Sequence, residues 1–368
     1  MEKKRMTVGI PAFKAEKHIC DCLSSIQMQS IRDDVTVIIA KDNPDDNYEF
    51  VKKRYPDLDI QILDCDKNTG PGLARQRALD ACKTDWITFI DADDVFMGPL
   101  SLENLMERIT PDCIEVQGPF FQEIKDHPQK IRMGMRNDAG HPWVFGRLYN
   151  TKFLSQNEIK FSELRAMEDG EFNWKIRMTI EGSPLKINII DDPIYFWRVG
   201  SEHSITRIGA DDDKDHIPQY NFDLCQWGAT VASINAIKFC KDKNPFNGSI
   251  TRFTTEMMIG QYFTYIECLG RKPIFAKQNL FNAKRFYNEA YKEIENQIGE
   301  KILKDMYTMQ MSYKSRDLIG IIPEITFFDF MDKIKNEEYG GEEEFKAIRA
   351  ELPQKIIDND IKSGVSTF

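Results

Sequence analysis

The chain has 368 residues, of which 41% are hydrophobic, and its formal net charge at pH 7 is −10. This length and apolar content are enough for a large buried core and predict roughly two to three domain-sized units. The acidic balance disfavours a nucleic-acid partner, because a negative surface repels polyanions, although a local basic patch is not excluded.

The distribution of apolar residues and cysteines bears on where the chain works. No apolar run reaches the about 18 residues that a membrane span needs. The short apolar stretch after the N-terminal basic residues contains Pro11, which fits a first strand better than a secretory signal. The eight cysteines are scattered without a Cys-x-x-Cys pair, as is typical of free thiols in a reducing compartment. We therefore expect a cytoplasmic protein without a membrane span.

The first third of the chain alternates between short β-branched runs and helical patterns. Strands are predicted at 6–12, 35–40, 59–63 and 86–90, and helices at 15–29, 45–55, 72–83 and 99–109. Strand–helix alternation with nearly continuous apolar strands predicts an α/β fold, in which helices cover both faces of a mostly parallel sheet.

The rest of the chain changes from a mixed pattern to a helical one. Strands are predicted at 113–118, 143–149 and 186–197, a helix at about 168–181, and a charged loop at 210–215. We expect a first domain at 1–215 (halves 1–98 and 99–215), a helical domain at 220–335, and an acidic helical or partly ordered tail at 336–368. The helical domain is expected to bind acceptor, a partner chain or a second copy in a homo-oligomer.

Four polar or glycine-containing segments follow the predicted strands of the first third. In an open parallel sheet, ligands bind beyond the carboxyl ends of the strands, so these segments are expected to line one crevice. They are Pro11-Ala12-Phe13, Lys41-Asp42-Asn43, the loop 68–72 with Gly70, and Asp91-Ala92-Asp93-Asp94.

Two of these segments have both a functional and a structural interpretation. Asp42 is a good acceptor for the donors of a base or ribose, but Asp42-Asn43-Pro44 is also typical of a turn. Gly70 allows the backbone to approach a ligand at a helix N-terminus, and Arg75 one turn later is suited to a diphosphate. Equally, the glycines make a turn and Arg75 lies on a solvated face.

The acidic segment after the fourth strand is the strongest signal. Alternate residues of an extended chain point the same way, so Asp91 and Asp93 are expected to face one ion together. Crowded carboxylates repel one another unless a cation neutralises them, and their oxygens suit Mn²⁺ or Mg²⁺. The alternative is a surface turn after a strand.

Candidate acceptor-side residues come later in the chain. Asp169 opens a predicted helix and is a candidate general base, although acids at a helix N-terminus are also favoured by capping. Arg198 is suited to the donor phosphates, and His203 to a third metal position or the leaving phosphate. Trp143 is suited to a platform under a sugar, although core packing is the more common role of tryptophan.

The order of these segments resembles family 2 glycosyltransferases of the GT-A type over roughly residues 5–205. The similar segments, in chain order, are TVGIPAFKAEKHICDCLSSIQMQS, NTGPGLARQRALDAC, WITFIDADD, HPWVFGRLYNTKFL with AMEDGEFNWKI, and YFWRVGSEHSIT. The resemblance implies a GT-A Rossmann-like domain followed here by a helical region.

The resemblance also implies roles for individual residues. Pro11, Ala12, Phe13 and Asp42 would hold the nucleotide, usually a uridine diphosphate, and Gly70, Arg75, Asp91, Ala92 and Arg198 complete the expected donor site. Asp91 and Asp93 would hold the metal, and Asp169 of the Glu168-Asp169 motif would be the base in a single inverting displacement. His203 is expected from the residues alone, as a third metal ligand. The expected partners are a nucleotide-sugar donor and a glycan or other hydroxyl acceptor, in surface glycan or glycopolymer synthesis.

The chain departs from the family pattern in two places. The second strand usually ends in an Asp-Asp-Gly-Ser type turn, but here it reads Ala40-Lys41-Asp42-Asn43-Pro44, so the first acid is missing. The donor loop contains Gly70-Pro71-Gly72 where a less rigid run of small residues is more common. The first departure concerns the base and ribose contacts, and the second concerns which donor is bound.

Three other functional classes use similar residues. Asp91-Ala92-Asp93-Asp94-Val95 also fits an aspartyl-nucleophile phosphatase, in which Asp91 attacks phosphorus and Asp93 is the acid. That motif normally lies on the first strand of its domain, whereas three predicted strands precede it here. A nucleotidyltransferase and a non-catalytic sugar-binding protein are the remaining alternatives.

Overall fold

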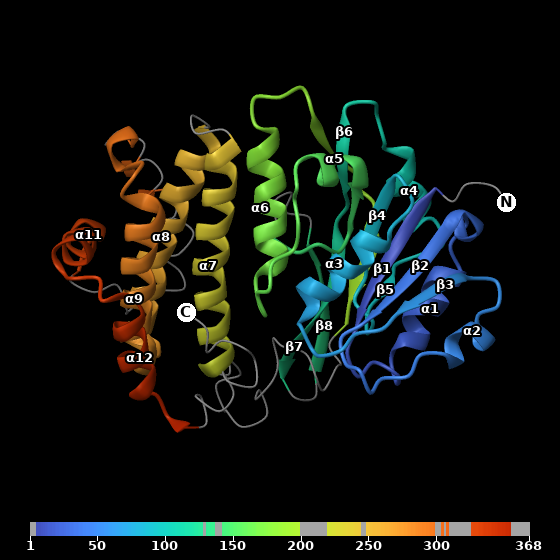
Figure 1. Cartoon of the computed structure of the whole chain (residues 1–368), viewed down its shortest axis with the longest axis horizontal. Helices are drawn as coiled ribbons and strands as arrows, with labels where there is room; N and C mark the ends of the chain where they lie inside the picture. Colours follow the sequence, from blue (N-terminus) through green and yellow to red (C-terminus); the bar gives the residue numbers. More distant parts are fainter. Residues whose placement is uncertain are drawn as a thin grey trace. The chain divides into compact units, whose positions relative to one another are not determined.

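The computed structural model describes residues 5–127, 130–136, 142–198, 219–243, 248–298, 303–304, 307–308 and 325–354. The chain divides into two compact units (Figure 1). Unit 1 comprises Met1–Leu164, Glu168–Ile176 and Gly182–Ser204, and unit 2 comprises Arg165–Met167, Arg177–Glu181 and Ile205–Phe368. The predicted domain boundary at 215 and the predicted loop at 210–215 lie outside the described residues.

A seven-stranded sheet forms the centre of unit 1. Its strands, in spatial order, are β10 (Lys186–Ile189), β6 (Cys113–Gln117), β9 (Arg147–Asn150), β4 (Trp86–Phe89), β1 (Met6–Ala12), β2 (Val35–Lys41) and β3 (Asp59–Leu63). Only β9 is antiparallel to its neighbours in this sheet; the other pairs are parallel. The mostly parallel sheet that the strand–helix alternation predicts is therefore confirmed.

Helices cover both faces of this sheet. Alternate residues of β1 point to opposite faces, and Val8 packs in one core with α1 (Ile19–Gln27) and α4 (Ser101–Glu107). Gly9 faces the other side, where a Cβ would lie 3.2 Å from Ala78 Cβ of α3 (Pro71–Ala81). On that side, the ring of Phe172 from α6 (Glu168–Ile180) stacks on that of Phe161 at 4.0 Å. The shorter elements of unit 1 are η1 (Arg32–Asp34), α2 (Phe50–Arg54) and α5 (Thr151–Gln156).

A second, four-stranded sheet differs from the sequence-based expectation. It runs in the order β5 (Val95–Phe96), β11 (Tyr195–Trp197), β7 (Phe120–His127) and β8 (Lys130–Arg136). The hairpin of β7 and β8 was not predicted. The prediction of a single strand at 186–197 is wrong, because Asp191-Asp192-Pro193 interrupts the run. The part after this interruption, β11, pairs with β5 and β7 in the second sheet.

Two predicted helices are shorter than expected. The helix at 15–29 spans only α1, and the helix at 45–55 spans only α2. Residues 43–47 form a hydrogen-bonded loop instead, since Asp46 and Asn43 are engaged by neighbouring loop groups. Short polar side chains of this kind favour loops over the helix interior.

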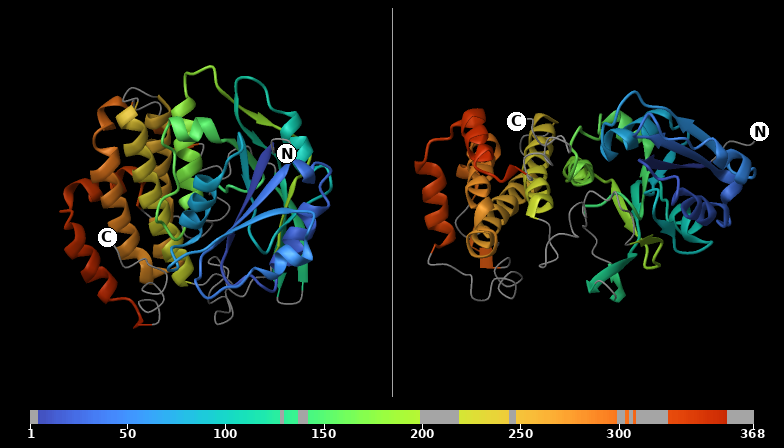
Figure 2. Two further views of the ribbon diagram at one scale, coloured as in Figure 1. Left: turned by 45° about the vertical axis from the view of Figure 1, so that its right-hand side comes forward. Right: turned by 90° about the horizontal axis from the view of Figure 1, so that it is seen from below.

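Unit 2 is helical, as predicted. Its helices are α7 (Gln219–Lys243), α8 (Gly248–Arg271), α9 (Ala276–Phe286), α11 (Phe327–Asn336) and α12 (Gly341–Ala350), with short turns η2 (Pro273–Phe275), η3 (Tyr287–Tyr291) and η4 (Glu295–Gln297). Helices α7 and α8 lie side by side, and α9 packs against both (Figures 1 and 2). In the described part of the chain, no helix is both long and apolar enough to cross a membrane.

Candidate active site

The segments predicted to line one crevice do lie along one edge of the large sheet. Strand β1 is parallel to β2 and β4, so the residues after all three strands emerge at the same edge. Asp42 N donates to Ala12 O at 2.7 Å, and Ile90 N donates to Gly9 O at 3.1 Å. Because β9 runs against β4, the residue Phe145 before β9 pairs with Phe89 at the same edge.

Asp42 fixes the loop that precedes α3. Its Oδ1 accepts hydrogen bonds from Thr69 N at 2.8 Å and Thr69 Oγ1 at 3.0 Å, and its Oδ2 accepts one from Gly70 N at 2.9 Å. Arg77 donates to Thr69 Oγ1 at 2.9 Å and lies 3.8 Å from the Asp42 carboxylate. Gly70 has a φ of 89°, which favours glycine at this turn. Asp42 thus has a structural role other than the predicted turn, because it holds the loop before α3. Its contact with a nucleotide stays a prediction.

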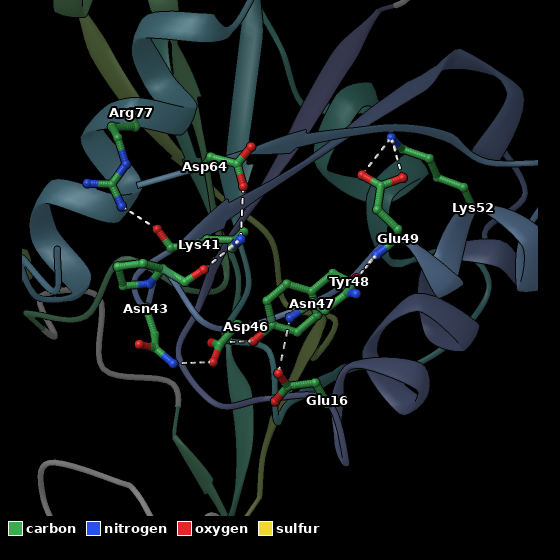
Figure 3. Close-up of polar contacts among 11 residues, drawn as sticks. Glu16, Lys41, Asn43, Asp46, Asn47, Tyr48, Glu49, Lys52, Asp64 and Arg77 are labelled. Carbon is green, nitrogen blue, oxygen red and sulfur yellow. Dashed lines mark hydrogen bonds and ion pairs between the residues drawn. The ribbon is translucent and has the colours of Figure 1, made fainter. Parts of the chain in front are cut away.

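A network of polar groups joins the loops after β1 and β2 (Figure 3). Asp46 Oδ2 accepts from Lys14 N at 2.6 Å and from the Tyr48 hydroxyl at 2.9 Å. Lys41 Nζ donates to Asp64 Oδ1 at 2.9 Å, and this bond raises the pKa of Lys41. The network engages the backbone of Lys14, the residue after Phe13, whose own side chain is exposed.

The turn after β4 separates its acids into two groups. Asp91 and Asp93 are partly exposed, whereas Ala92 and Asp94 are buried. Asp94 accepts hydrogen bonds from the Tyr195 hydroxyl at 2.5 Å and from Arg198 N at 2.7 Å. Burial alternates as predicted, but the backbone is not extended: Asp94 N donates to Asp91 O at 3.0 Å, which closes a turn, the alternative interpretation of this segment. Asp94 is a structural acid that ties the turn to β11. The Tyr195 contact was not predicted.

Arg75 connects the two halves of unit 1. Its guanidinium donates to Asp91 Oδ1 at 2.8 Å and to Glu168 Oε1 at 2.7 Å, and its side chain is only 6% exposed. Burial alone lowers the pKa of Arg75, but Asp91 and Glu168 outweigh burial and raise it. The solvated-face alternative for Arg75 is therefore wrong. The residue supplies part of the counter-charge that the crowded acids were expected to need.

Glu168 and Asp169 form a carboxylate pair at the N-terminus of α6. Burial raises the pKa of Asp169 to about 6, although Arg75 and the backbone N–H of Gly170, at 2.7 Å, act against it. Burial and the neighbouring Asp169 raise the pKa of Glu168 above its ordinary value, and the Arg75 guanidinium acts against them. Asp169 is the more exposed of the two, while Glu168 is committed to Arg75. The geometry thus favours Asp169 over Glu168 for proton transfer.

The remaining candidates have mixed outcomes. The Arg198 guanidinium pairs with Asp21 at 2.8 Å, near the sheet edge but at a partly exposed position. His203 lies outside the described residues. Among the residues that are described, no group of three or more His, Cys, Asp and Glu side chains is arranged to hold a metal. The metal role of Asp91 and Asp93 stays a prediction.

Comparisons with known proteins show what the part of the chain that carries this site is similar to. Residues 7–167 match the model of glycosyl transferase family 2. The chain is 32% identical over 92 residues to teichoic acid poly(glycerol phosphate) polymerase of Staphylococcus epidermidis, covering 24% of this chain and 13% of the relative. It is 24% identical over 255 residues to poly(ribitol-phosphate) beta-glucosyltransferase of Bacillus spizizenii, covering 64% of this chain and 37% of the relative. The chain thus spans well under two thirds of the length of both relatives.

A solved structure shares the fold. TarS residues 1–349 of S. aureus, crystallised with UDP, superpose with a TM-score of 0.55 and 17% identity, covering 84% of this chain and 91% of TarS. The expected GT-A type α/β domain, followed by a helical region, is confirmed. The motifs along the sheet edge lie mainly within residues 7–167, so this part of the chain is similar to glycosyl transferase family 2.

Proposed function

We propose that the chain transfers a sugar from a nucleotide-diphosphate sugar to an acceptor hydroxyl. One observation carries the proposal: Arg75 holds the Asp91 carboxylate on one side and the Glu168 carboxylate on the other. A donor site and an acceptor-side base must lie close together for a single displacement, because reacting atoms approach to about 3–3.5 Å. The buried arginine fixes the spacing between these two sites.

The acids after β4 fit a divalent cation that a ligand completes. Carboxylate oxygens suit Mg²⁺ and Mn²⁺, which commonly use one or two protein carboxylates plus substrate phosphate oxygens. Asp91 and Asp93 supply that donor set, and Asp94 is turned away into its bonds with Tyr195 and Arg198. When bound, such a cation would neutralise charge on the departing diphosphate.

Asp169 is the proposed general base. It would accept the proton of the acceptor hydroxyl as that oxygen bonds to the anomeric carbon and the bond to the diphosphate oxygen breaks, with inversion. A pKa of about 6 leaves most of the Asp169 carboxylate ionised at pH 7 while keeping it more basic than an ordinary aspartate. Arg75 would hold Glu168 in place beside it.

The donor is proposed to carry a uridine diphosphate. The expected contacts are Pro11, Ala12 and Phe13 after β1, and the loop that Asp42 holds around Gly70. TarS, with the same fold, has been crystallised with UDP. Lys41 occupies the position where the family usually has an acid. The preference for uracil over other nucleobases is therefore tested most directly by comparing the affinities of several nucleoside diphosphates.

The acceptor is proposed to be a hydroxyl of a surface glycan or glycopolymer. The names of the relatives refer to teichoic acid and to poly(ribitol phosphate), both of which are polyol phosphate polymers. These names describe those proteins, and they motivate the choice of acceptors to assay.

Two measurements test the proposed function. UDP is titrated into the protein with and without Mn²⁺, and we expect tighter binding with the metal; equal affinity in EDTA would remove the metal assignment. A panel of nucleotide-sugars is then assayed for released nucleoside diphosphate with wild type and Asp169→Asn. We expect Asp169→Asn to lose turnover but bind UDP like wild type. Release of pyrophosphate or inorganic phosphate instead would support a nucleotidyltransferase or a phosphatase.

A further inference from the structure

A cluster of five aromatic rings lies beside the acidic turn. Phe145 stacks on Tyr195 with centroids 4.4 Å apart and on Trp143 at 5.8 Å, with interplanar angles of 10° and 11°. Trp197 is tilted against Trp143 and Phe145 at 5.6 Å and 5.7 Å. Phe120 meets Trp143 edge-on at 5.6 Å. The rings of Phe120, Phe145 and Tyr195 are buried, whereas both tryptophans are partly exposed. The two indoles are therefore the solvent-facing members of the cluster.

The helix that carries the proposed base also positions Trp143. Asn173 Nδ2 donates to Trp143 O at 3.1 Å and to Pro142 O at 2.6 Å, while its Oδ1 accepts from the Tyr149 hydroxyl at 2.9 Å. Asn173 follows Asp169 by four residues on α6, so the two lie on one face about 6 Å apart along the helix. The backbone of Trp143 is therefore bonded to a residue that lies about one helical turn from Asp169.

The other indole is tied to the acidic turn. Tyr195 and Trp197 are two residues apart in β11, so their side chains lie on the same face of the second sheet. The Tyr195 hydroxyl donates to Asp94 Oδ2 and accepts from Asp91 N at 3.3 Å. The aromatic cluster is thus held between the base-carrying helix on one side and the donor-side acids on the other.

We propose that Trp143 and Trp197 form an acceptor subsite that stacks on the apolar face of a pyranose ring, and this assignment rests on the proposed function. An acceptor hydroxyl has to reach Asp169, and the two partly exposed indoles lie between the helix that carries Asp169 and the acidic turn of the donor side. Large, rigid aromatic side chains bind amphipathic rings at low entropic cost, since the buried rings behind them already fix their orientation. The subsite recognises a sugar ring of the acceptor; a linear polyol has no such face.

The kinetic test compares leucine variants at both positions with a phenylalanine variant at Trp143. We expect Trp143→Leu and Trp197→Leu each to raise the acceptor KM by about three- to tenfold, the range for loss of one aromatic stacking contact. Trp143→Phe keeps an aromatic face and is expected to recover much of that loss. UDP affinity, measured by titration, reports on the donor site and is expected to stay at the wild-type value. An unchanged acceptor KM in both leucine variants, or a parallel loss of UDP affinity, would overturn the assignment.

A binding test separates this subsite from the proposed reaction. Methyl β-glycosides of glucose, galactose and N-acetylglucosamine are titrated against Asp169→Asn while tryptophan emission is recorded. We expect at least one glycoside to change the tryptophan emission of Asp169→Asn. The change is expected to disappear when Trp143→Leu and Trp197→Leu are added to the same protein. Glycoside binding without any transferase activity in wild type would keep the subsite and refute the proposed function. No emission change with any of the three glycosides, or the same change in the double leucine variant, would refute the subsite.

Discussion

Replacement of Arg75 tests whether one buried guanidinium holds the two halves of the site together. The Arg75→Met variant leaves Glu168, with a side chain 6% exposed, and Asp91, 32% exposed, without their shared partner. Breaking a buried ion pair by removing one member costs about 3–5 kcal/mol, whereas partly exposed pairs are worth far less. We therefore assign most of the effect to the Glu168 arm and expect a loss of about 3 kcal/mol in unfolding free energy at neutral pH.

A double-mutant cycle isolates that arm. Arg75→Met leaves the buried Glu168 carboxylate without its partner, and Glu168→Gln removes that charge. The double variant is therefore expected to lose clearly less stability than the sum of the two single losses. Urea unfolding followed by circular dichroism gives a coupling energy, which we expect to be about 2–3 kcal/mol. Lys52 and Glu49 provide the control pair, with a 3.1 Å contact but side chains 47% and 65% exposed, and a coupling of about 0–1 kcal/mol is expected there. A coupling energy below about 1 kcal/mol between Arg75 and Glu168 would refute the idea that Arg75 holds the two halves of the site together.

Three further predictions concern the chemistry of the site. The kcat/KM of the wild type is expected to fall as the pH drops through about 6, because protonation of Asp169 in the free enzyme, where its pKa is raised to about 6, removes the base; a pH profile of kcat/KM with an acid limb near 4 would contradict this. Asp93→Asn is expected to weaken Mn²⁺-dependent UDP binding at least tenfold while leaving the affinity in EDTA unchanged, as calorimetry would show. Tyr195→Phe leaves the buried Asp94 without one of its donors, so we expect a loss of about 1–3 kcal/mol in urea unfolding, and no loss would contradict a structural role for that bond.

Local patterns were sufficient to predict the elements that carry the donor site. The apolar run 86–90 followed by acids predicted a buried strand and an outward alternation, and the structure has Asp91 and Asp93 partly exposed with Asp94 buried. The rule that ligand-binding segments follow parallel strands correctly grouped the ends of β1, β2 and β4. These features depend on periods of two residues and on strand direction, both of which a single sequence carries.

Long-range pairings could not be predicted in the same way. Arg75 and Glu168 are 93 residues apart in the chain, and their contact exists only because α3 and α6 cover the same face of the sheet. The bond between Tyr195 and Asp94 spans 101 residues and depends on a second sheet that the sequence interpretation missed. Strand β11 was merged with β10 because both runs are apolar, and periodicity alone does not show that they join different sheets.

Gly72 shows how closely the two halves of the site are packed. A Cβ at this position would lie 2.8 Å from Glu168 Cγ and 2.8 Å from the backbone oxygen of Ser162, which has little freedom to move. Alanine favours helix over glycine by up to about 1 kcal/mol, but overpacking typically costs about 1–3 kcal/mol, so we expect Gly72→Ala to destabilise the protein by about 1 kcal/mol net.

The displacement of Glu168 is expected to reach the neighbouring Asp169, so kcat in Gly72→Ala should fall while UDP affinity is retained. Gly98→Ala is the matched control, because a Cβ there meets nothing within 4 Å. Urea unfolding and transferase assays on both variants decide the matter. If Gly72→Ala were as stable and active as Gly98→Ala, the close contact between α3 and the start of α6 would have no part in positioning the base, and Arg75 alone would have to account for it.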